Sequence, residues 1–89
     1  MKLDADGTLA FPCRYPVKAL THAAGTALDE VIAAIAAQGI DADPESVKVR
    51  PSRNGRFQSI TVEVHANSRA ELETVYASLR ALDVVVMTL

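Results

Sequence analysis

The stretch from residue 47 to residue 66 constrains the fold more than any other part of this sequence. It reads VKVRPSRNGRFQSITVEVHA, in which two segments of alternating apolar and polar residues flank Asn54-Gly55. Alternation with a period of two is typical of strands, and Asn-Gly between two such segments is the strongest short-range hairpin signal. Residues 46–50 and 57–66 are therefore predicted to pair as antiparallel strands. The residues expected to face inward are Val47, Val49, Ile60, Val62 and Val64.

Helical patterns lie on both sides of this hairpin. Before it, apolar residues at i, i+3, i+4 and i+7 form one stripe of an amphipathic helix. Thr26 is the expected N-cap of this helix, and Gly39 is the expected left-handed residue at its end. After the hairpin, Ser68 and Glu71 form a capping-box pattern that opens a second helix. The residues expected on the buried faces are Leu28, Val31, Ile32 and Ile35, then Leu72, Val75, Tyr76 and Leu79.

Two further strands are predicted at residues 15–23 and 84–89. Pro16 lacks an N–H group and is expected at the start of the first of these, and Pro51 restricts the second strand to a sheet edge. The element order is β-α-β-β-α-β. This order predicts an α+β ferredoxin-like sandwich, with a four-stranded antiparallel sheet in the order 4-1-3-2 and two helices on one face.

Length and composition limit the classes of function. The 89 residues leave room for one core, expected at residues 11–89 after a flexible arm at residues 1–10. A net charge of −2 argues against a dedicated nucleic-acid or membrane-surface protein. Residues 1–12 lack the apolar segment of a secretory signal, and no apolar run is long enough to span a bilayer. The expected location is the cytoplasm.

Four basic residues lie within nine positions that hold no acid, namely Lys48, Arg50, Arg53 and Arg56. Guanidinium groups and turn N–H groups can bind a phosphate or a carboxylate. Exposed hairpins are also basic for solubility and to protect sheet edges, so a purely solvating role stays open. These four residues are the predicted contact site for an anion or an acidic partner.

A second candidate binding site lies where the first strand meets the first helix. Gly25 precedes the expected N-cap Thr26. A glycine there allows a ligand to approach the backbone, and the free N–H groups of the first helical turn attract anions. Helix capping explains most of the same pattern.

The reactive side chains form no catalytic constellation. Cys13 stands beside Arg14, which could lower the pKa of the thiol, but neighbours in an extended chain need not face each other. His22 and His65 could share the open sheet face as a metal-binding pair, without a third ligand nearby. RNA recognition on such a sheet needs stacking aromatics, and the third strand offers only Phe57 at its start. The sequence therefore predicts a non-enzymatic protein without metal or cofactor, and makes nucleic acid an unfavoured partner.

Several segments resemble the YbeD-like family of small bacterial proteins. They are LAFPC at 9–13, YPVK at 15–18, RPSxxGxFxSITV at 50–62 and AxS at 66–68. The resemblance extends to residue 89 and implies a fold similar to that of ACT regulatory domains. Such domains bind small effectors, often amino acids, at the strand–helix junction and at dimer interfaces. Carried over, this points to Gly25 and Thr26, although Ala23-Ala24-Gly25 replaces the usual Asp-x-Pro-Gly lead-in.

The leading hypothesis is a non-enzymatic, ACT-like regulatory or protein-interaction module. It would dock its open sheet face or a sheet edge on a protein partner or on itself, and the short apolar last strand is a candidate edge for a dimer. One alternative is a domain that binds an amino acid or anionic metabolite as an effector. The other is an enzyme that uses Cys13 or the two histidines.

Overall fold

The computed structural model describes residues 10–89, so residues 1–9 of the expected N-terminal arm lie outside the described part. No helix within residues 10–89 is long and apolar enough to cross a membrane. The elements are, in order, β1 (Cys13–His22), α1 (Ala27–Ala37), β2 (Asp41–Ala42), the 3₁₀ turn η1 (Pro44–Ser46), β3 (Lys48–Pro51), β4 (Phe57–Ala66), α2 (Arg69–Arg80) and β5 (Val85–Thr88).

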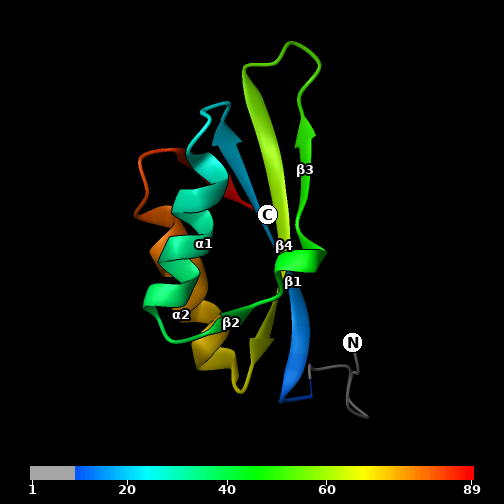
Figure 1. Cartoon of the computed structure of the whole chain (residues 1–89). Coiled ribbons are helices and arrows are strands. Elements are labelled where there is room, and N and C mark those ends of the chain that lie inside the picture. The colour runs from blue at the N-terminus through cyan, green and yellow to red at the C-terminus, as the bar shows by residue number, and fades with distance from the viewer. Residues whose placement is uncertain (1–9) are drawn as a thin grey trace.

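The strands form one antiparallel sheet, and both helices lie on the same side of it (Figure 1). β1 and β4 are central, β5 pairs with β1 at one edge, and β2 and β3 both pair with β4 at the other. The ferredoxin-like α+β fold and the order 4-1-3-2 are confirmed. The one difference is that the expected second strand is divided into β2 and β3.

The interruption between β2 and β3 has a local cause. Ala42 stands opposite Val64 and Lys48 opposite Thr61, so residues 43–47 face only residues 62 and 63 of β4. Glu63 nevertheless keeps both backbone bonds on this side. Its carbonyl accepts from Asp43 N–H at 2.9 Å, and its N–H donates to Ser46 Oγ at 2.8 Å. A hydroxyl thus replaces one backbone partner, which lets the edge bulge outward without an unpaired group.

The core lies between the helices and the central strands. Ile60, Val62 and Val64 of β4 are each 1% exposed, as expected. Val49 faces the same side as its partner Ile60, as predicted, but this inward-facing side chain is 44% exposed. β3 lies outside β4 at the edge of the sheet and packs mainly on β4, so the helices leave Val49 partly uncovered. The other fully buried side chains include Val17, Val31, Ile35, Val75 and Leu79.

The helix ends differ in how their free N–H groups are satisfied. Ser68 Oγ accepts from Glu71 N–H at 3.2 Å, which confirms the predicted cap of α2. Thr26 occupies the N-cap of α1 but makes no capping bond, and its hydroxyl instead donates to Glu30 Oε2 at 2.9 Å. Gly39 follows α1 with φ +73°, the left-handed conformation expected there.

Pro16 lies inside β1, not at its start as predicted, because β1 begins at Cys13. It stands opposite Glu63, whose N–H and carbonyl are both used on the far side of β4. β5 pairs with β1 only between Ala19 and Thr21. The backbone nitrogen of Pro16 therefore faces a part of the β1 edge that has no strand partner among residues 10–89. The absence of an N–H group there removes no hydrogen bond between strands.

Candidate functional site

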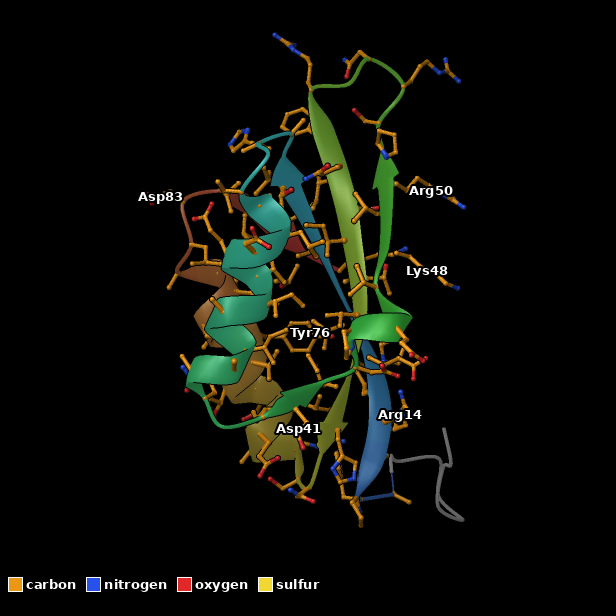
Figure 2. All side chains as sticks on the ribbon, in the orientation of Figure 1. Arg14, Asp41, Lys48, Arg50, Tyr76 and Asp83 are labelled. Atoms are coloured by element: carbon orange, nitrogen blue, oxygen red, sulfur yellow. The ribbon has the colours of Figure 1, made fainter. Side chains whose placement is uncertain are left out.

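The polar side chains of the central strands gather on the sheet face opposite the helices, called here the open face. Val17 and Ala19 are each 1% exposed and face the helices, so the alternate residues of β1 face the other way. Directly paired residues share a face. Figure 2 shows Arg14, Lys48 and Arg50 pointing away from the helix layer.

Three strands bring basic residues together on this face. Thr61 of β4 stands between Lys18 of β1 and Lys48 of β3, so these three form one row across the sheet. In the next row Ser59 stands opposite Arg50. All five line a surface hollow of about 180 Å³, named here the basic hollow.

None of the three cations of the basic hollow forms an ion pair within residues 10–89. The ion pairs of this part of the chain join Arg14 to Asp43 and to Glu63. The three cations are exposed, while the two hydroxyl residues between them are half-buried. Positive charges and hydroxyl donors on one small area form a site that attracts a negatively charged group.

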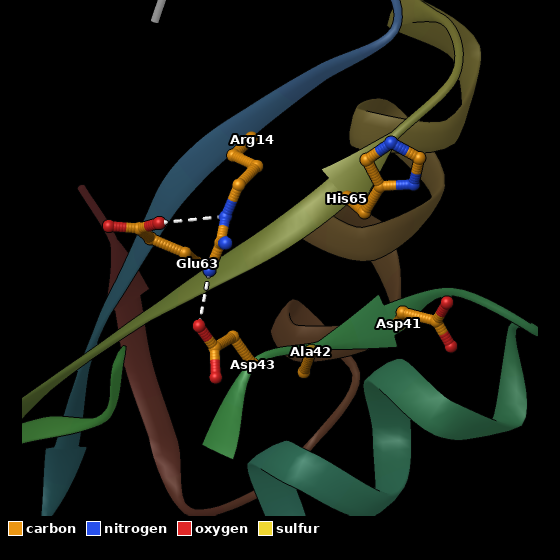
Figure 3. Close-up of a pocket in the computed structure, with 6 residues that line it drawn as sticks. All are labelled: Arg14, Asp41, Ala42, Asp43, Glu63 and His65. Atoms are coloured by element: carbon orange, nitrogen blue, oxygen red, sulfur yellow. Dashed lines mark hydrogen bonds and ion pairs between the residues drawn. The ribbon is translucent and has the colours of Figure 1, made fainter. Parts of the chain in front are cut away.

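The opposite end of the open face carries acids (Figure 3). A hollow of about 230 Å³ is lined by Arg14, Asp41, Ala42, Asp43, Glu63 and His65. Arg14 Nε donates to Glu63 Oε1 at 3.1 Å, and its terminal nitrogen pairs with Asp43. Asp41, Asp43 and Glu63 are named here the acidic end. One arginine against three carboxylates leaves this end negative.

Hydrogen bonds keep Asp43 charged. Glu45 N–H donates to Asp43 Oδ1 at 2.9 Å, and this bond, followed by the one from Arg14, lowers the pKa of Asp43 below its ordinary value. The same contact with Asp43, followed by the charges of Asp43 and Glu63, raises the pKa of Arg14. Arg14 therefore orients two carboxylates, Asp43 and Glu63, on the open face.

The comparisons with known proteins identify the family. A family model described as "Protein of unknown function (DUF493)" matches residues 6–89. The chain belongs to this family. It is 37% identical over 82 residues to a UPF0250 protein of Azotobacter vinelandii, with 91% of this chain and 89% of the relative covered. A UPF0250 protein of Vibrio cholerae is 33% identical over 81 residues, with 91% and 86% covered. The resemblance to the YbeD-like family is confirmed.

A solved structure supports the fold. The solution structure of protein HP0495 from H. pylori matches this DUF493 chain with a TM-score of 0.66 at 21% identity. The match covers 100% of this chain and 94% of that one. At this identity the likeness shows the shared fold and carries no statement about what either protein binds.

The structure divides the four basic residues that the sequence grouped in this DUF493 protein. Lys48 and Arg50 line the basic hollow, whereas Arg53 and Arg56 are exposed in the turn that follows β3 and are not among its lining residues. Gly55 in that turn has φ +73°. Sequence reasoning missed the other members of the hollow: Lys18, Ser59 and Thr61. The alternation of these three residues with buried ones could have placed them on the open face. Their proximity to one another, however, depends on strand register.

The second predicted site, Gly25 and Thr26, connects β1 to α1. The hydroxyl of Thr26 is already bonded to Glu30, whose carboxylate stands at the helix start, where an anionic ligand would have to bind. A Cβ at Gly25 would meet nothing within 4 Å, so no neighbour within residues 10–89 requires a glycine there. The predicted ligand role of these two residues stays a prediction.

The reactive side chains are kept apart. Cys13 is buried on the helix-covered face, and Arg14 projects from the opposite face toward Asp43. His22 packs on Phe57 with ring centroids 5.6 Å apart, while His65 stands opposite Arg14. Eight positions of β1 separate those two points, roughly 26 Å at the rise of a strand.

The hypothesis that the two histidines form a metal pair is therefore wrong, although both lie on the open face as expected. Within residues 10–89 no group of three or more His, Cys, Asp or Glu residues is placed to hold a metal ion.

An apolar groove of about 610 Å³ lies between α1 and the β2–η1 segment. Among residues 10–89, Asp29 is the only charged residue that lines it, beside Leu28, Ile32, Ala33, Ala42, Pro44 and Val47. This groove offers no cation to an acidic ligand, so the basic hollow is the better candidate for an anionic group.

Proposed function

We propose that this DUF493 protein is a non-enzymatic interaction module whose basic hollow binds an acidic group of a protein partner. The observation that supports the proposal is the convergence of three cations from β1 and β3 around two hydroxyls of β4, with no ion pair to residues 10–89. Because the protein as a whole carries a net charge of −2, this local field would orient an acidic partner on one face.

The residue types in the basic hollow suit a carboxylate or a phosphate. Arg50 can donate two parallel hydrogen bonds to either group, whereas Lys18 and Lys48 act as compact point charges. Ser59 and Thr61 add hydroxyl donors between them. The proposal includes a regulatory role for this ACT-like module in the bacterial cytoplasm. It would regulate its partner by binding the partner's acidic segment.

Size favours a single acidic group over a whole effector. The hollow measures about 180 Å³, below the roughly 300–1,000 Å³ of typical small-molecule sites. One Asp or Glu side chain of a larger partner fits such a space. A free anionic metabolite remains the second candidate, supported by the hydroxyls at the centre of the hollow.

The test compares two matched charge reversals. Lys48→Glu with Arg50→Glu changes the hollow, and Arg53→Glu with Arg56→Glu makes the same change of charge in the turn. Binding of a hexaglutamate peptide, followed by amide chemical shifts in the full chain, is expected to map to β1, β3 and β4. The hollow pair should weaken binding by about tenfold or more, and raised salt should weaken it further.

Equal losses from the two pairs, or no loss from the hollow pair, would overturn the assignment. Free glutamate and inorganic phosphate serve as additional probes. Saturable binding of either at the hollow, with no binding of the peptide, would favour the small-effector candidate instead.

A further inference from the structure

The open face carries both signs of charge, separated along the strands. The basic hollow occupies the rows of Ser59 and Thr61, and the acidic end occupies the next two rows, at Glu63 and His65. Successive rows on one face are about 6.6 Å apart, twice the rise per residue. One half of this face is therefore positive and the adjoining half is negative.

The two halves also share an edge of the sheet. Lys48 and Arg50 lie on β3, while Asp41 lies on β2 and Asp43 directly follows it. β2 and β3 both border β4, one beyond the other along its length. A second molecule could lie on this face with its strands reversed and each strand opposite the same strand of the first molecule. This two-fold rotation would place β3 of one molecule over β2 of the other.

We propose that the partner of the basic hollow is a second copy of this chain, docked open face to open face. The two-fold axis would lie between the sheets, perpendicular to the strands and midway between the rows of Thr61 and Glu63. The basic hollow of each copy then receives the acidic end of the other, twice by symmetry. This inference rests on the proposed function, since it names the acidic partner.

The register defines which charges would meet. The row of Thr61 comes opposite the row of Glu63 in the other copy, which brings Lys48 over Asp43, since Asp43 N–H bonds to the Glu63 carbonyl. The row of Ser59 comes opposite the row of His65, which brings Arg50 over Asp41. Lys18 lies in the same row as Lys48 and would reach Glu63 on the neighbouring strand.

A different symmetry operation does not give this match. With the axis parallel to the strands, each row would meet itself, and the β3 edge would face the β5 edge of the other copy. Arg50 would then stand opposite Met87, which is 48% exposed and shares the row of Leu20. An apolar side chain gives a guanidinium no charge partner. Charge complementarity therefore selects the axis perpendicular to the strands.

Arg14 prepares the acidic end for this contact. Its bonds hold Asp43 and Glu63 on the open face, and the bond from Glu45 N–H keeps Asp43 ionised. The three cations of the hollow would meet three carboxylates, two of which, Asp43 and Glu63, already share Arg14. The contact is polar, so the dimer is expected to be weak and to dissociate as salt is raised.

The experiment measures the mass of the full chain by sedimentation equilibrium over a range of concentrations, in low and in high salt. The first variant carries Lys48→Glu and Arg50→Glu, and the second carries Asp41→Lys and Asp43→Lys. Each alone should be monomeric, because like charges would face each other in both contacts. An equimolar mixture should form a heterodimer, because both contacts are then again between opposite charges.

The turn pair, Arg53→Glu with Arg56→Glu, serves as the control and should dimerise like the wild type. Circular dichroism checks that every variant folds. A dimer that all variants retain, or a mixture that stays monomeric beside a dimeric wild type, would overturn this interface. A wild type that stays monomeric but binds hexaglutamate at the hollow would overturn the self-association and leave the proposed function standing. If neither association nor peptide binding occurs, both fail.

Discussion

Arg14 illustrates how alternation decides the surroundings of a single residue. Its sequence neighbour Cys13 suggested an activated thiol, but successive side chains of β1 point to opposite faces. Cys13 is buried opposite Ala66, and Arg14 instead bonds to Asp43 and Glu63 on the open face. The bulge between β2 and β3 brings Asp43 into reach. A residue that looked like part of a reactive pair therefore orients carboxylates.

Tyr76 gives a prediction at the scale of one side chain. Burial, followed by the neighbouring Tyr15 hydroxyl, raises the pKa of Tyr76 to about 12. The folded state therefore holds the phenol proton more tightly than the unfolded state, whose pKa is about 10. The stabilising contribution is complete below pH about 10 and is lost as the pH rises toward about 12.

Ultraviolet titration of the phenolate in Tyr15→Phe, which leaves Tyr76 as the only tyrosine, should give an apparent pKa above the ordinary value. Urea unfolding of Tyr76→Phe should show a smaller alkaline loss of stability than the wild type. Ionisation of Tyr76 at its ordinary pKa in the native protein would contradict the prediction.

The two helices show that similar sequence patterns can begin differently. Both Thr26 and Ser68 precede a helix and were predicted as N-caps, yet only Ser68 accepts a backbone N–H. Thr26 has φ −93° and ψ −3°, close to helical, whereas Ser68 is extended at φ −159° and ψ 164°. An extended N-cap turns its oxygen toward the third residue of the helix, and a helical one does not.

Matched substitutions test this difference between the helices. Ser68→Ala is expected to lower the free energy of unfolding by about 1 kcal/mol, because Glu71 N–H loses its acceptor. Thr26→Ala loses only an exposed side-chain bond to Glu30 and should change stability by less than about 0.5 kcal/mol. Urea unfolding of both variants gives the comparison. Equal losses would show that Thr26 also caps in solution.

At the scale of the whole molecule, helix coverage decides where the core ends. Val49 of β3 and Val62 of β4 face the same side of one sheet, but they are 44% and 1% exposed. The helices pack over the central strands β1 and β4, whereas β3 lies outside β4 at the sheet edge. An alternating pattern alone cannot distinguish an inward face that is covered from one that is not.

The same substitution at both positions measures this boundary. Val62→Thr places a hydroxyl in the core and is expected to lower the free energy of unfolding by about 1–3 kcal/mol. Val49→Thr keeps the β-branched shape at an exposed position and should change it by less than about 0.5 kcal/mol. Thermal or urea unfolding of the two variants provides the measurement. A large loss at Val49 would mean that another surface covers it.

Much of the fold could be predicted because local patterns agreed with one another. Residues 57–66 were predicted as a strand and β4 spans Phe57–Ala66, since a long alternating run has only one favourable register against a core. The second strand was predicted less well. Its bulge depends on Ser46 Oγ replacing a backbone acceptor for Glu63, an interaction between residues 17 positions apart.

The sequence by itself determined the strands, the helices and their order, because alternation, helical stripes and caps act between residues a few positions apart. Only the tertiary structure decided the basic hollow, which joins Lys18 to residues 30 or more positions later in the chain. Strand register creates that proximity, and register arises from the packing of the whole sheet on its helices. The acidic end likewise exists because the edge bulges beside Glu63, which places opposite charges on one face.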